Sequence, residues 1–277
     1  MRVAEKNPYH IMKVYRQMAG KEFDFMEIRT FGVGGRLCEC KLRLSEKIGN
    51  HFSGRVLLLP IPTTRDGVHI TGTDVALTEL LSEVDSNTVT VGYGIPHNIA
   101  YEIRSMGGAV FDAGEDEEFL EANAEITARG ALGWILTEGR KDATDLKIGI
   151  IGYGRIGKCL LRLLLFLGAE VTVYTTKASV AEELCVEGIA ARVFPWNICE
   201  DNLDLLVNTA PARLVPSDEE ERFLLNARIL DLASGKIFGE HENLTKLASI
   251  PEAFYPVSSG AVYADRIIGF LELEGAV

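Results

Sequence analysis

The stretch LKIGIIGYGRIGKCLLRLLLFLGAEVTVYTTK, residues 146–177, decides the fold of the second half of this chain. Its apolar runs and glycines predict a strand, a turn, a helix and a second strand, over Ile148–Ile151, Gly152–Gly157, Ile156–Leu167 and Glu170–Tyr174. The glycines of the turn fit G-x-G-x-x-G, and they stand between a strand and a helix, as a dinucleotide-binding site requires. The alternative is a structural βαβ unit with a coincidental glycine turn.

Each glycine has its own task in such a turn. Gly152 permits the tight turn, Gly154 lets the backbone approach a pyrophosphate, and Gly157 lets the helix lie close to the strand. The N-terminus of the helix adds unpaired N–H groups and a partial positive charge. We therefore expect the cofactor to contact the whole turn, at Gly152, Tyr153, Gly154, Arg155, Ile156 and Gly157.

The end of the second strand indicates which dinucleotide binds. An NAD site has Asp or Glu there for the ribose hydroxyls, whereas this chain has Thr175, Thr176 and Lys177. No acidic residue occurs between Glu170 and Glu182. Hydroxyls and a cation suit a 2′-phosphate, so the sequence favours NADP over NAD and disfavours FAD. The alternative is that Lys177 is only a solvated loop lysine.

Composition narrows the partners and the compartment. The chain of 277 residues has a net charge of −12, which disfavours nucleic acid and anionic membranes as partners. Its first residues contain no apolar signal segment, and its most apolar run, Leu160–Leu167, is too short to span a bilayer. The five cysteines form no CxxC pair, and Cys38 and Cys40 would share a face in a strand. We expect a cytoplasmic protein with reduced thiols and no metal site.

The first half of the chain alternates expected strands and helices, which predicts a second α/β domain. These elements are a helix over 8–19, strands over Phe25–Thr30, Arg55–Leu59, Thr88–Val91 and Ala109–Phe111, and helices over Thr73–Val84 and Pro96–Met106. A long helix over Glu121–Glu138 then crosses to the Rossmann half. That half continues with helices near Ala178–Glu187 and Ser217–Phe223 and strands near Ala191–Phe194, Asp204–Asn208 and Ile229–Leu232.

The predicted fold class is therefore α/β, with two α/β domains, the second a Rossmann-type doubly wound parallel sheet. We place the N-terminal substrate domain at 1–122 and the NADP-binding domain at 123–260. The segment 261–277 is expected to return to the first domain as a helix.

Ligands of open α/β sheets bind beyond the carboxyl ends of the strands, which selects the loops there. Thr63, Thr64 and Arg65 could bind a small carboxylate, or their loop could be an ordinary surface loop. His97 could be an acid/base group or merely begin a helix. The remaining candidates are a cofactor loop, Asn208, Thr209, Ala210 and Pro211, and a small-residue loop over 256–260 with Ser258 and Ser259.

Several stretches together resemble the A subunit of dipicolinate synthase. They are LLLPIPTTRDGV (57–68), NAEITARGAL (123–132), IGIIGYGRIGK (148–158), LVNTAPARLV (206–215), ILDLASGK (229–236) and PVSSGAV (256–262). The architecture is also similar to that of D-2-hydroxyacid dehydrogenases and adenosylhomocysteinases. One departure is Arg129, which stands where the family has a carboxylate in its crossing helix.

The resemblance implies an NADP-dependent dehydrogenation that makes dipicolinate from a dihydrodipicolinate-type precursor during spore formation. It further implies a small dicarboxylate substrate, a flavoprotein-like B subunit as partner and, by analogy with other dehydrogenases, a homo-oligomer. Thr63, Thr64 and Arg65 would then hold one carboxylate, and Ser258 and Ser259 would lie near the other. No catalytic base is assigned. Two alternatives stay open, a related dehydrogenase of another small acid and a non-catalytic nucleotide-binding partner or sensor protein.

Overall fold

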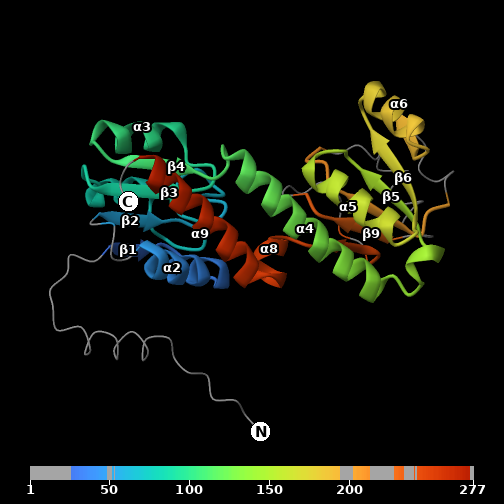
Figure 1. Cartoon of the computed structure of the whole chain (residues 1–277), viewed down its shortest axis with the longest axis horizontal. Helices are drawn as coiled ribbons and strands as arrows, with labels where there is room; N and C mark the ends of the chain where they lie inside the picture. The colour runs from blue at the N-terminus through green and yellow to red at the C-terminus, as the bar shows by residue number, and fades with distance from the viewer. Residues whose placement is uncertain are drawn as a thin grey trace, which may run out of the picture.

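The computed structural model describes residues 26–48, 52, 54–193, 202–212, 228–233, 240 and 242–274. These residues form two parallel sheets with helices packed on them, joined by the long helix α4 (Figure 1). The predicted class, two α/β units with a Rossmann-type second sheet, is confirmed. The helices predicted over 8–19 and Ser217–Phe223 lie outside the described residues.

The first sheet has the strand order β1-β2-β3-β4, and all its pairs are parallel. Its strands are β1 (Glu27–Thr30), β2 (Arg55–Leu58), β3 (Thr88–Gly92) and β4 (Ala109–Asp112). The elements between them are α2 (Gly35–Ile48), the 3₁₀ helix η1 (Leu77–Glu83) and α3 (His97–Ser105). Every residue of β3 is buried, as expected for a parallel strand covered on both faces.

The second sheet has the order β10-β9-β8-β5-β6-β7, again all parallel. Its strands are β5 (Lys147–Ile151), β6 (Glu170–Thr175), β7 (Ala190–Val193), β8 (Leu205–Asn208), β9 (Arg228–Asp231) and β10 (Leu244–Lys246). Counted from β5, this is the 3-2-1-4-5-6 order of the Rossmann fold. The helices α5 (Arg155–Phe166) and α6 (Ala178–Val186) connect β5 to β6 and β6 to β7.

The chain passes between the two sheets twice. It crosses first through α4 (Glu117–Glu138) and returns through α8 (Ile250–Phe254). A Cβ on Gly130 of α4 would lie 2.2 Å from Cγ2 of Ile250, so the glycine allows the two crossing segments to pack closely. The domain limits drawn from the sequence stay a prediction.

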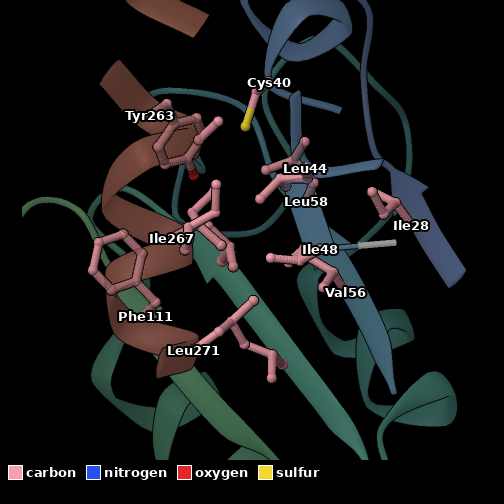
Figure 2. Close-up of a cluster of buried hydrophobic side chains, with 14 of the residues drawn as sticks. Ile28, Cys40, Leu44, Ile48, Val56, Leu58, Phe111, Tyr263, Ile267 and Leu271 are labelled. Carbon is pink, nitrogen blue, oxygen red and sulfur yellow. The ribbon is translucent and has the colours of Figure 1, made fainter. Parts of the chain in front are cut away.

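The last helix, α9 (Pro256–Leu273), completes the core of the first sheet. Tyr263, Ile267 and Leu271 are fully buried on it, and Figure 2 shows them in one cluster with Val56 and Leu58 of β2. Residues from both ends of the described chain therefore share one hydrophobic core.

Three local predictions are wrong. Cys38 and Cys40 lie on the helix α2 and not on a strand, so Cys38 is exposed while Cys40 is buried. The helix expected over Thr73–Val84 is only the 3₁₀ helix η1, because its earlier residues form a turn. The loop expected over 256–260 is the first turn of α9.

The cysteines Cys38, Cys40, Cys159 and Cys185 are free thiols, and burial raises the pKa of Cys40 and of Cys159. Within the described part of the chain, no helix is long and apolar enough to cross a membrane.

Candidate dinucleotide site

The glycine turn follows β5 at the carboxyl edge of the second sheet. Gly152 has φ +95°, and a Cβ on it would lie 2.8 Å from Oγ1 of Thr209. A Cβ on Gly157 would lie 2.3 Å from the carbonyl oxygen of Gly152. A side chain at either position would collide with the turn or with the strand loop beside it, so the backbone path depends on both glycines.

Gly154, by contrast, faces open space. It is the N-cap of α5, and a Cβ on it would meet nothing within 4 Å. The open side of this residue lies where the first N–H groups of a twelve-residue helix are unpaired. A pyrophosphate could therefore approach the helix N-terminus over Gly154.

A cavity of about 290 Å³ opens beside the turn, toward the end of β6. Thr176 and Lys177 line it from the strand end, and Lys158 lines it from α5, with its Nζ 5.3 Å from the centre of the Tyr153 ring. Glu183 of α6 is the carboxylate of this lining. Sequence reasoning missed Lys158, although it directly follows the last glycine of the motif.

Thr175 has a supporting place in this cavity. Its side chain is buried, and its Oγ1 accepts a hydrogen bond of 3.1 Å from the backbone N–H of Lys177. Thr175 therefore shapes the turn that presents Lys177, whereas Thr176 and Lys177 are the exposed residues of the strand end.

The loop after β8 is held mainly by its own side chains. Asn208 is buried and donates from Nδ2 to Oδ1 of Asp231 at 2.8 Å, and Thr209 donates from Oγ1 to the carbonyl oxygen of Ile151 at 2.9 Å. Ala210 lines the cavity, and Pro211 is exposed next to it. Of the predicted cofactor residues, Asn208 and Thr209 therefore form hydrogen bonds within the protein that hold the end of β8 against its neighbouring strands. The partner of Asn208, Asp231, was missed, although it lies in the ILDLASGK stretch.

Ion pairs join this turn to the first turns of α4. Arg155, the first residue of α5, approaches Glu117 with Nη2 to Oε2 at 2.5 Å and Glu121 with Nε to Oε1 at 3.1 Å. Glu117 begins α4 soon after β4 ends at Asp112. The glycine turn therefore lies beside the start of α4, which follows the carboxyl end of β4.

The predicted substrate residues on that edge have different surroundings. Thr63 is buried, and its Oγ1 accepts a hydrogen bond of 2.8 Å from the N–H of Tyr93. Thr64 donates to Oδ1 of Asp66 at 3.1 Å. Arg65 is exposed, and no described residue is found bonded to its side chain. His97 is exposed at the start of α3.

The two serines predicted in a ligand loop lie in the first turns of α9 instead. Ser259 is buried, accepts from Nε of Arg36 at 3.2 Å and donates to the carbonyl oxygen of Pro251 at 3.0 Å. Ser258 is exposed on the helix. Arg129 pairs with Glu125 on its own helix at 2.6 Å. The pattern of small residues that suggested a loop is explained by close packing, since a Cβ on Gly260 would lie 2.7 Å from the carbonyl oxygen of Arg36.

No protein-family model and no curated protein sequence matches the chain. Among solved structures, the A subunit of dipicolinate synthase from Bacillus halodurans matches with a TM-score of 0.70 and 17% identity, over 91% of this chain and 99% of that one. Its counterpart from Bacillus subtilis matches with a TM-score of 0.72 and 17% identity, over 93% and 99%. A D-isomer specific 2-hydroxyacid dehydrogenase from Lactobacillus delbrueckii ssp. bulgaricus, in an NAD-complexed form, matches with a TM-score of 0.52 and 11% identity, over 90% and 98%. The chain therefore shares its two-domain Rossmann fold with the A subunit of dipicolinate synthase and with NAD(P)-dependent dehydrogenases.

Proposed function

We propose that the chain is an NADP-dependent dehydrogenase that resembles the A subunit of dipicolinate synthase and oxidises a dihydrodipicolinate-type precursor to dipicolinate. One observation carries the proposal: an open glycine turn, with a lysine-lined cavity beside it, is paired with the start of α4, the helix that follows the last strand of the substrate-side sheet. The same proposal includes a role in spore formation, a cytoplasmic location, a homo-oligomeric state and a flavoprotein-like B subunit as partner.

The cavity lining supports NADP over NAD. Lys158 and Lys177 approach the cavity from a helix and from a strand end, so a 2′-phosphate between them would meet two cations. Glu183 opposes such a phosphate, and the preference depends on the lysines outweighing that one carboxylate. No acidic residue stands at the strand end, where an NAD site has one to bind the ribose hydroxyls.

In the reaction, NADP would supply an acceptor for a hydride from the substrate ring. The protein's own residues would bind and orient the two partners. The turn at Gly154 would receive the pyrophosphate, and Arg65, exposed on the facing edge, is suited to hold a substrate carboxylate.

Titration with NADPH and NADH tests the cofactor, and Lys177→Glu tests the residue. We expect NADPH affinity to fall at least tenfold and NADH affinity to change little, because one charge-assisted contact contributes about 1.5–3 kcal/mol. Lys41→Glu is the matched control, because it reverses the same charge on α2, which belongs to the other unit. It should leave the affinities for NADPH and NADH unchanged. Equal losses for both nucleotides in Lys177→Glu would contradict the assignment.

A non-catalytic nucleotide-binding or sensor role is a second candidate, and one observation favours it. Thr63, Thr64 and Ser259, which were expected to bind substrate, are engaged in hydrogen bonds within the protein. A protein that binds NADPH tightly but does not oxidise dihydrodipicolinate, or another small dicarboxylate, would support this role over the enzyme.

A further inference from the structure

The loop that follows β2 contains a paired aspartate and histidine. Nδ1 of His69 lies 2.8 Å from Oδ2 of Asp66. The other oxygen, Oδ1, accepts from the N–H groups of Val68 and His69, both at 2.8 Å, and from the hydroxyl of Thr64 at 3.1 Å. The hydrogen bonds from His69 and Val68 lower the pKa of Asp66, so the carboxylate is ionised and fixed in place.

This pairing settles which ring nitrogen is available. An ionised carboxylate can only accept, so Nδ1 of His69 donates, and Nε2 of the neutral ring keeps its lone pair. The side chain of His69 is 48% exposed, so Nε2 is not sealed inside the loop. An imidazole oriented by a carboxylate in this way is the usual arrangement of a general base.

The loop is anchored at the carboxyl edge of the first sheet. The N–H of Thr71 donates to the carbonyl oxygen of Thr63 at 2.9 Å, and the N–H of Leu77 donates to that of Val68 at 2.8 Å. Thr63 is tied in turn to Tyr93 in the next strand loop. The aspartate–histidine pair is therefore fixed at the carboxyl edge of the first sheet, the edge from which the chain continues through β4 into α4 and its ion pairs with Arg155.

Other titratable groups on this edge fit the role of proton acceptor less well. The carboxylate of Asp112 accepts from the N–H groups of Gly94, Ile95 and Gly114, at 2.7–2.8 Å, so both its oxygens are engaged. His97 stands at the N-terminus of α3, where the helix dipole opposes the imidazolium that proton transfer would create. The carboxylate of Asp66 instead stabilises that imidazolium on His69.

We propose that His69, oriented by Asp66, is the proton acceptor of the dehydrogenation. The assignment rests on the proposed function. In this step one bond to hydrogen in the substrate ring breaks as a hydride passes to NADP⁺, and a second breaks as its proton passes to Nε2 of His69. The ring loses an electron pair and becomes aromatic, NADP⁺ becomes NADPH, and His69 afterwards releases the proton to water.

The charged groups around His69 are few. On its own loop the charged residues are Asp66 and Arg65, and on the described segment that pairs with it through Ala76 they are Asp74 and Glu79. The carboxylate of Glu79 accepts a hydrogen bond of 2.9 Å from the N–H of Ala76 through Oε1. Asp66 is the described residue whose side chain bonds to the ring of His69.

The test measures oxidation of dihydrodipicolinate by the full-length protein with NADP⁺ across pH, together with NADPH binding. His69→Gln should lower kcat by about a hundredfold or more, the usual share of a general base, with NADPH affinity unchanged. A base acts only when it is neutral, so wild-type kcat/KM should fall at acidic pH, and His69→Gln should remove that fall. Asp66→Asn removes the carboxylate that orients the ring of His69, so it should also lower kcat without changing NADPH affinity.

Asp85→Asn is the matched control, because Asp85 also caps its own turn, through Thr88 and Asn87, but precedes β3 at the other edge of the sheet. It should leave kcat and the pH profile unchanged. His69→Gln with wild-type kcat and an intact acid limb overturns the assignment while leaving the proposed function standing. A wild-type protein that binds NADPH but oxidises no substrate overturns the proposed enzyme, and the role of His69 with it.

Discussion

At the scale of single residues, Gly152 and Gly154 should respond in opposite ways to the same substitution. Gly152→Ala forces an L-residue to φ +95° and brings its Cβ to 2.8 Å from Thr209, so we expect a loss of about 1–3 kcal/mol in the free energy of unfolding. Gly154→Ala meets no atom and should change stability by less than about 0.5 kcal/mol. It should nevertheless weaken NADPH binding at least tenfold, because the new methyl group occupies the path of the pyrophosphate.

Urea unfolding and NADPH titration of both variants check this pair. If Gly154→Ala bound NADPH with wild-type affinity, the pyrophosphate would have to lie elsewhere, and the glycine turn would be structural only.

The sequence predicted the roles of the glycines better than those of the polar residues. A glycine is needed where neighbouring atoms leave no room for a Cβ. The spacing of the motif alone places Gly152 and Gly157 at such points. A hydroxyl or an amide shows only that a residue can form a hydrogen bond, not with what. Asn208 and Ser259 therefore seemed free to bind ligands, while in the structure they bond to Asp231 and Arg36.

At the scale of elements, the helix α2 shows how a sequence pattern can mislead. Cys38, Cys40, Leu42 and Leu44 alternate with charged residues, and such alternation is typical of a strand. The buried set is instead Leu37, Cys40, Leu44 and Ile48, which follows the spacing of a helix. Packing against α9 decides between the strand pattern and the helix pattern. A short stretch of sequence around α2 does not contain α9, so it cannot reveal that packing. In the Rossmann half, glycines and long apolar runs mark the same boundaries, and the predicted strands and helices that fall on described residues agree with the structure within a few residues.

The crossing helix α4 allows a test with two glycines on one element. Gly130→Ala would bring a methyl group to 2.2 Å from Ile250, and such overpacking should cost about 1–3 kcal/mol of stability. Gly133 has only the hydroxyl of Tyr255 near its Cβ position, at 3.9 Å. Gly133→Ala should therefore stabilise the protein by about 0.5–1 kcal/mol through helix propensity.

Thermal and urea unfolding of the two variants, side by side, separates packing from propensity. Equal shifts of the same sign would mean that the contact between α4 and α8 does not limit how closely the crossing segments approach.

At the scale of the whole molecule, the hydrophobic clusters of the two sheets are built from different parts of the chain. On one face of the first sheet a cluster joins residues 28–119 to residues 263–271 of α9, and on the other face a second cluster uses residues 31–110 alone. The cluster of the second sheet uses the stretch between, from Ala128 to Ile250. Substitutions in α9 should therefore act on strands that precede it by more than a hundred residues, and not on the nearer Rossmann strands.

Ile267→Ala and Ile150→Ala test this division, because both isoleucines are fully buried, one in each core. Each substitution should cost about 2–5 kcal/mol, including the cavity that it leaves. Hydrogen exchange followed by mass spectrometry should show protection lost in β1–β4 for Ile267→Ala and in β5, β6 and β8 for Ile150→Ala. Equal loss of protection across both sheets in either variant would contradict this division. It would show that the two units unfold together, because a cavity in one core would then destabilise the other unit through α4 and α8.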